Sequence, residues 1–394
     1  TETLSDEACS VVLSYSPPRL ICLLDDQVDE QEDQLSLGYK GYSLARLKTL
    51  GMPVPPGFVV STELFDIQGA LDYQDLAKDT RERVVATVER LEGITELRCN
   101  DPDRPLILSV RSGSAFSMPG MMDTILNLGL NSETLQGEIE QTGDPRFGYD
   151  AYRRFIQLFG KVALGISDEL FDEQFEAVKQ RAHVTEDVGL SAADLQDISE
   201  RFLKVVEDQT GRPFPEDPYQ QLEIAIKAVF NSWMGKRAVD YRREFNITPD
   251  MANGTAVNVQ TMVFGNLGDD SATGVGFTRY PDTGANKLFG EYLVNAQGED
   301  VVAQVEHREP VDLADAAPIE VDQHQPVVDP LAQQVLDEVD PVGPLVQRLV
   351  DVGRPDRLRV GLGRPVARLA NQVGDLGEPG GQLLPRADEA HRVL

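Results

Sequence analysis

The stretch Gly254-Thr-Ala-Val-Asn-Val-Gln-Thr-Met-Val-Phe-Gly-Asn266 has the clearest strand pattern in this chain of 394 residues. Successive side chains of a strand point to opposite sides, so alternate residues share a face. One predicted face carries Ala256, Asn258, Gln260 and Met262. On that face, Gln260 and Met262 could meet a nucleobase by hydrogen bonding and packing. The more ordinary alternative is a half-buried strand whose polar side chains face solvent.

Strand and helix patterns alternate on both sides of this stretch. Short strands are expected at Phe58–Val60 and Leu106–Val110 before it, and at Gly274–Thr278 and Leu288–Val294 after it. Residues 147–245 are expected to be mainly helical, because apolar residues recur there at intervals of three and four. The alternation predicts an α/β or α+β fold for the first 300 residues.

Composition argues against several classes of function. The net charge of −30 would repel nucleic acid and anionic membranes, so we expect neither as a partner. No apolar run approaches the length of a membrane span. The three cysteines and four histidines show no metal-ligand spacing, and an odd number of cysteines argues against a disulfide framework. These features favour a cytoplasmic protein.

Gly38-Tyr39-Lys40-Gly41 places a lysine between two glycines, just before a helix predicted at Tyr42–Leu50. Glycines let the backbone approach a phosphate, and a helix N-terminus supplies N–H groups and a partial positive charge. Lys40 would add a full charge beside the same anion. Taken alone, such a segment is more often an ordinary surface turn with a solvated lysine.

Ser109-Val110-Arg111-Ser112-Gly113 ends a predicted strand with an arginine and small residues. Arg111 could hold phosphate oxygens with its forked guanidinium, or it could form a structural ion pair. Next comes Ser117-Met-Pro-Gly-Met-Met-Asp-Thr124, in which three methionines surround Pro-Gly. This spacing is not that of a helix or strand core, and it indicates a functional loop with adaptable apolar contacts.

Asn295-Ala-Gln-Gly-Glu-Asp300 gathers amides and carboxylates where the last predicted strand ends. Such a group could contact a ribose or a metal ion, and it could equally be a polar turn.

Residues 305–394 differ in kind from the rest of the chain. They contain no Lys, Ser, Thr, Met, Cys, Phe, Tyr or Trp. A folded domain of this size normally has aromatic residues in its core. We therefore expect a poorly structured tail, with transient helix around Leu331–Leu349 and a sheet edge left exposed by missing strands.

Together these segments resemble the N-terminal ATP-binding region of the pyruvate, phosphate dikinase family. The matching pieces follow the family's order and cover about 260 residues. They are Lys40-Gly41 through Pro53-Val-Pro-Pro-Gly57, Ser109 through Leu130, Asp150-Ala-Tyr-Arg-Arg-Phe155, Phe214 through Arg243, and Gly254 through Val302. The methionine-rich loop separates this family from the related phosphoenolpyruvate synthases.

The resemblance implies an ATP-grasp-type fold over residues 36–304, with a helical insertion at about 147–245, after an acidic segment at 1–35. It implies ATP as a ligand between two subdomains. Carried over by position, Lys40 and Arg111 are the expected catalytic phosphate ligands. Gln260 and Met262 lie on the strand expected near adenine, and Glu299 is the expected ribose contact.

In this family the β-phosphate of ATP passes to a histidine on a swivelling domain, which carries it to a barrel that binds pyruvate. The full reaction converts ATP, pyruvate and phosphate into AMP, phosphoenolpyruvate and diphosphate, with Mg²⁺ bridging the ATP phosphates. By resemblance, this chain would meet pyruvate and phosphate only through those further domains. A homodimer is compatible with the resemblance.

The family pattern is expected to stop after Ala303. The Asp-x-Glu-Phe and Leu-Gln-Thr-Arg motifs that hold Mg²⁺ in the family have no match in residues 305–394, so we assign no metal ligand. One hypothesis is an inert fragment whose tail comes from translation in the wrong frame, and another is a stand-alone nucleotide-binding module. A third, an intact kinase using tail acids such as Asp337 and Glu338, has no spacing to support it.

Overall fold

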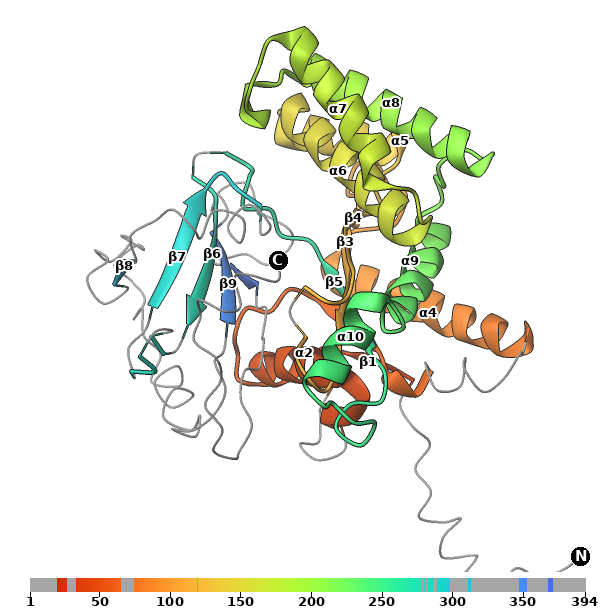
Figure 1. The fold of residues 1–394 in the computed structure, drawn as a ribbon, viewed down its shortest axis with the longest axis vertical. Helices are drawn as coiled ribbons and strands as arrows, with labels where there is room; N and C mark the ends of the chain where they lie inside the picture. The colour runs from red at the N-terminus through yellow and green to blue at the C-terminus, as the bar shows by residue number, and fades with distance from the viewer. Residues whose placement is uncertain are drawn as a thin grey trace, which may run out of the picture.

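A computed structural model describes residues 20–26, 33–64, 74–118, 120–268, 270–277, 279–280, 283–285 and 289–297, with short strands at 311–312, 347–352 and 368–370. These residues build two five-stranded sheets, the first flanked by helices and the second standing beside it (Figure 1). Every helix in this part of the chain is too short or too polar to span a bilayer.

The first sheet has the strand order β1-β2-β5-β3-β4, and all neighbouring strands are antiparallel. Its strands are β1 (Ile21–Leu23), β2 (Gly57–Val60), β3 (Leu108–Gly113), β4 (Thr124–Leu128) and β5 (Ala256–Thr261). The strand predicted from the alternation is confirmed as β5, the middle strand, although it ends before Phe264. It is buried on both faces, so its polar side chains do not simply face solvent.

Three helices cover one face of the first sheet, which we call the core face: α4 (Gln74–Thr95), α6 (Pro145–Ala163) and α9 (Pro218–Ser232). Phe58, Val110 and Val259, from three different strands, are fully buried in this layer. Burying a side chain of this size contributes roughly 1.5–3 kcal/mol. The core face therefore carries much of the apolar burial that stabilises the fold.

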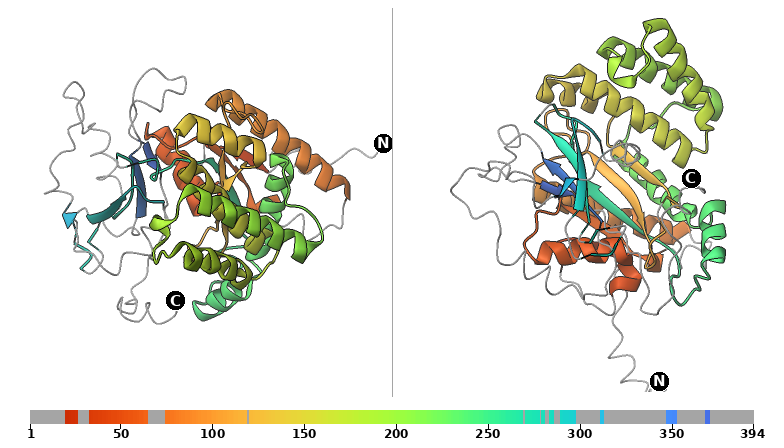
Figure 2. Two further views of the ribbon diagram at one scale, coloured as in Figure 1. Left: turned by 90° about the horizontal axis from the view of Figure 1, so that it is seen from above. Right: turned by 60° about the vertical axis from the view of Figure 1, so that its left-hand side comes forward.

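The opposite face, which we call the α2 face, packs against α2 (Asp33–Thr49). Leu44, Val59 and Ala256 meet there in a smaller apolar cluster. α2 begins well before the helix predicted at Tyr42–Leu50 and contains a break at Gly38. The second sheet lies on this same side of the first sheet, away from α4 and α9 (Figures 1 and 2).

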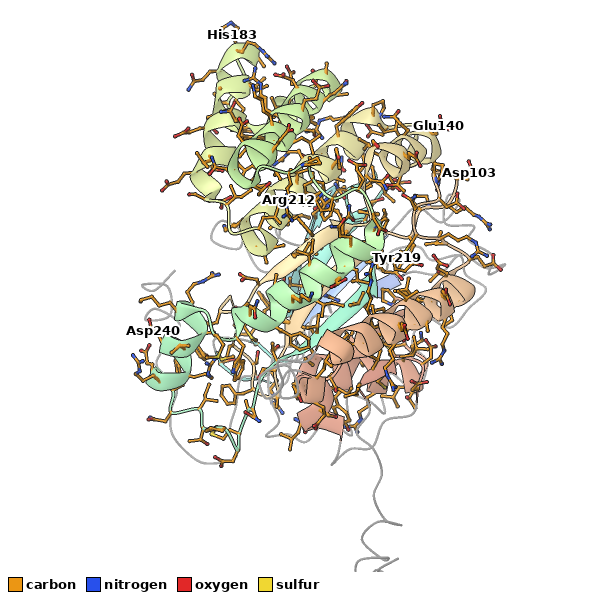
Figure 3. All side chains as sticks on the ribbon, turned by 90° about the vertical axis from the view of Figure 1, so that its right-hand side faces the viewer. Asp103, Glu140, His183, Arg212, Tyr219 and Asp240 are labelled. Carbon is orange, nitrogen blue, oxygen red and sulfur yellow. The ribbon has the colours of Figure 1, made fainter. Side chains whose placement is uncertain are left out.

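The helical character predicted for residues 147–245 is confirmed. Besides α6 and α9, the elements are α5 (Ser132–Thr142), α7 (Asp168–Ala182), the 3-10 turn η1 (Asp187–Gly189), α8 (Ala192–Thr210) and α10 (Lys236–Glu244). The two helices α7 and α8 bury Phe171 against Phe202, with ring centroids 5.0 Å apart. Their charged side chains cover the outside, and His183 lies at the far tip of α7 (Figure 3).

The second sheet has the order β10-β9-β6-β7-β8 and is also antiparallel throughout. β6 (Ala272–Phe277) and β7 (Phe289–Val294) match strands predicted from the sequence. The other three are β8 (Val311–Asp312), β9 (Gln347–Val352) and β10 (Arg368–Ala370), all within the segment expected to be a tail. β9 pairs with β6 along the whole of that strand.

The sequence predicted a sheet edge left exposed by missing strands, but the edge of β6 is paired by β9. The free N–H and C=O groups of a strand edge bond any extended segment that reaches them. Gln347–Val352 contains Leu349, Val350 and Val352, which suit a strand. These residues include the end of the helix predicted at Leu331–Leu349. The rest of that helix lies outside the described residues, as does 354–394 except for β10.

Candidate functional site

Polar side chains gather on the α2 face from two neighbouring strands. Arg111 on β3 lies opposite Asn258 on β5, and Ser109 lies opposite Gln260. Because these pairs are in register, all four side chains point to the same side of the sheet, while the residues between them point to the core face. The amide-bearing face recognised in the sequence is thus joined by the predicted phosphate ligand Arg111.

Gly38 determines where Lys40 lies. Its backbone has a positive φ of 67° with ψ of 162°, which divides α2 into two segments. A Cβ at this position would lie 2.0 Å from the Gly113 carbonyl oxygen, so no larger residue fits. The Tyr39 N–H donates to the Ser114 carbonyl at 3.0 Å. The second segment of α2 therefore starts against the end of β3, with Lys40 in its first turn.

Two further glycines bring α2 and β3 against Asn258, which is fully buried. A Cβ at Gly113 would lie 2.4 Å from Asn258 Nδ2 and 3.3 Å from Lys40 Cβ. A Cβ at Gly41 would lie 2.9 Å from Asn258 Oδ1. The Asn258 Nδ2 donates to the Arg111 carbonyl at 3.5 Å, and its Oδ1 has no hydrogen-bond partner. This close packing brings Lys40 within electrostatic reach of Arg111.

The surroundings of both cations disfavour their charged forms in the free chain. Burial, and then the nearby charge of Arg111, lower the pKa of Lys40 to about 7. Burial lowers the pKa of Arg111 to about 10. Among the described residues, no carboxylate forms an ion pair with either one, and Arg111 Nε is buried without a hydrogen-bond partner. Two half-buried cations of this kind are suited to an anion with several oxygens.

Gln260 is committed to the protein rather than open to a ligand. Its Oε1 accepts a short hydrogen bond from Arg111 Nη2. Its Nε2 donates to the Pro55 carbonyl at 3.0 Å, and the residue is only 2% exposed. The hydrogen bond to a nucleobase expected for Gln260 would require both contacts to be rearranged.

The other two predicted site residues are not brought to Lys40 and Arg111 by any described contact. Met262 follows β5, where its N–H donates to the Ile107 carbonyl at 2.9 Å. Its half-buried side chain packs against the apolar cluster of the core face. Glu299 lies outside the described residues. Their roles beside adenine and ribose stay predictions.

The methionine-rich loop, which the sequence indicated to be a functional loop with adaptable apolar contacts, makes its apolar contacts within the fold. Met118 is buried, and Met121 and Met122 are half-buried, in a small cluster with Trp233 and Ile247. The loop is also tied to α10, because Arg237 binds the Asp123 carboxylate at 3.0 Å and the Gly120 carbonyl at 3.2 Å. Its methionines therefore fill a local core beside β3 and β4.

Two residues that shape this site were not singled out from the sequence. Asn258 was recognised as part of the amide face but given no role, and Pro55 was only part of a family match. The available signals were the Asn-x-Gln alternation and the Pro-Pro-Gly turn. Within the described ranges, no group of three or more His, Cys, Asp or Glu side chains is arranged to hold a metal ion.

The family described as "Pyruvate phosphate dikinase, AMP/ATP-binding domain" matches residues 82–324. The chain is 52% identical over 269 residues to pyruvate, phosphate dikinase of Entamoeba histolytica, covering 68% of this chain and 30% of that protein. It is 42% identical over 373 residues to pyruvate, phosphate dikinase of Rhizobium meliloti, covering 92% of this chain and 41% of the relative. It is 50% identical over 277 residues to a chloroplastic rice pyruvate, phosphate dikinase, covering 70% and 29% respectively.

These matches show how much of the chain is similar to the family at each end. The chain spans between 29% and 41% of the length of these relatives. Arg111 and Gln260 lie inside the residues matched by the family, whereas Lys40 precedes them. The family match ends at residue 324, and the Rhizobium alignment covers too much of the chain to stop at residue 304. Similarity thus continues beyond the point at which the motifs in the sequence ended.

Proposed function

The chain belongs to the family of the pyruvate phosphate dikinase AMP/ATP-binding domain, and we propose that it binds ATP with Lys40 and Arg111 on the phosphates. The observation that carries this proposal is the pair of half-buried cations without a described carboxylate partner. A triphosphate would supply the missing negative charge, and the guanidinium fork and ammonium group are both common phosphate ligands.

The local backbone supports the same ligand. The break at Gly38 gives the second segment of α2 its own N-terminal turn, whose partial positive charge favours an anion. The chain as a whole carries a charge of −30, which would repel a free nucleotide at long range. A concentrated local pair of cations overcomes this repulsion at contact distance, because screening by salt weakens the distant charges first.

We further propose an ATP-grasp-type arrangement in which the nucleotide lies between the α2 face and the second sheet. The second sheet stands on the α2 side of the first sheet, which supports this arrangement (Figure 2). In this arrangement Glu299 contacts the ribose, and Met262 would reach adenine only by turning away from the core-face cluster against which its side chain packs. The nucleotide-binding region would then comprise about residues 36–304 and the strands that complete the second sheet.

At the level of the whole protein, we propose a pyruvate, phosphate dikinase-like phosphotransferase of which this chain supplies the nucleotide-binding portion. The named relatives support the reaction class, and the chain spans at most 41% of their length. We expect the 394 residues on their own to bind ATP without forming phosphoenolpyruvate. Mg²⁺ is a family expectation, and no described cluster is assigned to it.

The test is the affinity for ATP and for adenosine, measured by calorimetry on the full chain and on Lys40→Gln and Arg111→Met. Each variant should weaken ATP binding by roughly 10- to 100-fold, because a hydrogen bond to a charged group contributes about 1.5–3 kcal/mol. Adenosine binding should not change. Lys236→Gln, which alters an exposed lysine on α10, is the control. Equal losses for ATP and adenosine, or no loss, would contradict the assignment.

A further inference from the structure

We infer that Gln260 is a positioning residue that aims the Arg111 guanidinium at the bound anion, an inference that rests on the proposed binding of ATP phosphates. Two hydrogen bonds connect three groups: the Gln260 amide donates to the Pro55 carbonyl and accepts from Arg111 Nη2. Gln260 is the next-to-last residue of β5, the middle strand, and is almost completely buried. It is therefore held from both ends and has little freedom to do anything else.

The chemistry of the two neighbours fixes the orientation of the Gln260 amide. A carbonyl oxygen only accepts hydrogen bonds, and a guanidinium only donates them. With Nε2 on Pro55 and Oε1 on Arg111, both contacts are satisfied. The reversed amide would set two donors against each other at one end and two acceptors at the other. A buried group left without a partner costs about 1–3 kcal/mol, which excludes the reversed form.

The turn that holds the other end of Gln260 is stiff. Pro55 and Pro56 have fixed φ angles and no N–H, so their carbonyls are the groups left to bond. The Pro56 carbonyl accepts from both the N–H and the hydroxyl of Thr261, each at 2.9 Å. Gly57 lies opposite Gln260, and a Cβ there would be 2.9 Å from the Gln260 Cα, so the turn approaches β5 closely. Gln260 is thus anchored to a rigid point.

This anchoring has a consequence for Arg111. One Nη2 hydrogen is used by Gln260, which restrains rotation of the guanidinium, while Nε stays without a partner. An anion approaching Lys40 and Arg111 then meets donors that are already oriented. A guanidinium that is already oriented binds an anion more tightly, because less side-chain freedom is lost on binding. Gln260 would affect phosphate binding through Arg111 and would leave the base untouched.

The experiment uses Gln260→Leu in the full chain, with Thr261→Val as the matched control. Thr261→Val removes a hydrogen bond to the same Pro-Pro turn without touching Arg111. Calorimetry should show ATP binding about 10-fold weaker for Gln260→Leu, with adenosine binding unchanged and Thr261→Val like the parent. In an Arg111→Met background, Gln260→Leu should have no further effect on ATP. An equal loss of adenosine binding, or a full additional loss in that background, would overturn the inference.

A second measurement does not depend on ATP. In the chain labelled with ¹⁵N-arginine, the Arg111 side-chain signal, assigned with Arg111→Met, should show hindered guanidinium rotation that Gln260→Leu releases. A freely rotating Arg111 in the parent chain would overturn the inference even if ATP binds. If the parent chain binds no ATP while the rotation is hindered, the proposed function fails and the positioning contact stands. Should Gln260→Leu not fold, Gln260→Met serves instead, because its longer side chain fills more of the same space without a strong acceptor for Arg111. Unchanged ATP affinity in Gln260→Met would count against the inference.

Discussion

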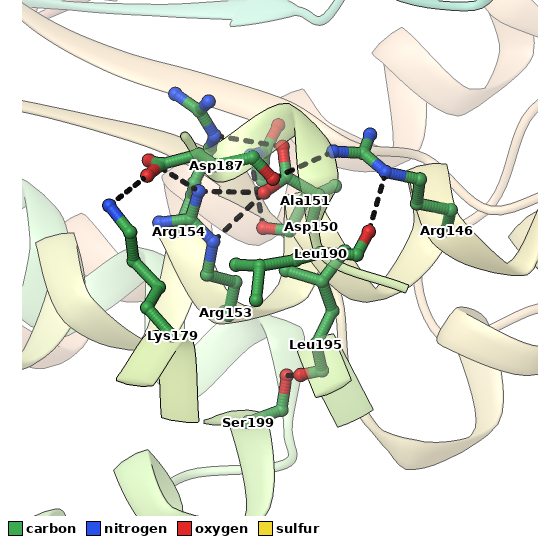
Figure 4. Close-up of polar contacts among 11 residues, drawn as sticks. Arg146, Asp150, Ala151, Arg153, Arg154, Lys179, Asp187, Leu190, Leu195 and Ser199 are labelled. Atoms are coloured by element: carbon green, nitrogen blue, oxygen red, sulfur yellow. Dashed lines mark hydrogen bonds and ion pairs between the residues drawn. The ribbon is translucent and has the colours of Figure 1, made fainter. Parts of the chain in front are cut away.

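In the helical region, Arg153 and Arg154 both bind the carboxylate of Asp150 (Figure 4). On the α2 face, Lys40 and Arg111 lie near each other, and no described carboxylate forms an ion pair with either of them. Asp150 Oδ1 accepts from Arg153 Nη2 at 2.7 Å, and Oδ2 accepts from Arg154 Nε at 3.0 Å. Arg153 also lies over the Phe175 ring, 4.7 Å from its centroid. Asp150, Arg153 and Arg154 therefore all have oppositely charged partners within the fold.

The pKa values show how the two groups differ. Burial alone would raise the pKa of Asp150, but Arg153 and Arg154 outweigh it and leave that pKa below its usual value. At Lys40, burial and Arg111 act in the same direction and lower the pKa. A saturated cluster stabilises the chain that contains it, while an unsaturated one costs stability until a ligand arrives. This difference separates a structural arginine cluster from a candidate binding site with similar residue types.

Breaking the saturated cluster should have the largest effect. Asp150→Asn leaves the buried Arg153 and the half-buried Arg154 without the carboxylate that they share, so we expect the free energy of unfolding to fall by about 3–5 kcal/mol. Urea denaturation followed by circular dichroism would measure it. Asp240→Asn, which removes an exposed carboxylate paired with Lys236, should leave the stability almost unchanged. Similar losses for the two variants would show that Asp150 is not a special anchor.

The pH dependence of ATP binding should sharpen the contrast. Lys40 has a pKa of about 7 in the free chain, and a bound phosphate would raise it. Above that pH, binding must take up a proton, so affinity should fall as pH rises, by about tenfold between pH 7 and 9. Calorimetry in buffers of different ionisation enthalpy would detect the uptake. Lys40→Met should lose this slope, and an unchanged slope in that variant would assign the proton elsewhere.

The smallest expected effect is on the stability of the free chain. Lys40→Met removes one of two neighbouring cations, so we expect unfolding to cost about 1 kcal/mol more, a figure reduced for the partial solvent contact of Lys40. The pKa of Lys40 is lower in the folded chain than in the unfolded chain. The penalty of the parent is therefore fully present below about pH 7 and shrinks as pH rises toward 10.5. Denaturation of both proteins at pH 6 and pH 9 tests this, and a less stable variant at pH 6 would contradict it.

Local patterns were enough to find the elements that bury a regular stripe or face. β5 and the helices between residues 147 and 245 could be predicted because their apolar spacing repeats over many residues. β1 has only three residues, so it offers little periodicity. β9 and β10 could not be predicted from composition, because a strand that completes a sheet is stabilised by backbone hydrogen bonds to a distant partner.

The sequence by itself predicted Lys40 and Arg111 as phosphate ligands, because glycines around a lysine and an arginine at a strand end are local signals. It could not show that these two residues, far apart in the chain, lie close together in the fold. Their meeting depends on the register of β3 with β5 and on the space left by Gly38, Gly41 and Gly113. Only the tertiary structure shows that the Gln260 amide is bonded to Arg111 and to the Pro55 carbonyl. The same amide can bind a base or an arginine, and only the groups packed around it determine which of its hydrogen bonds are already made.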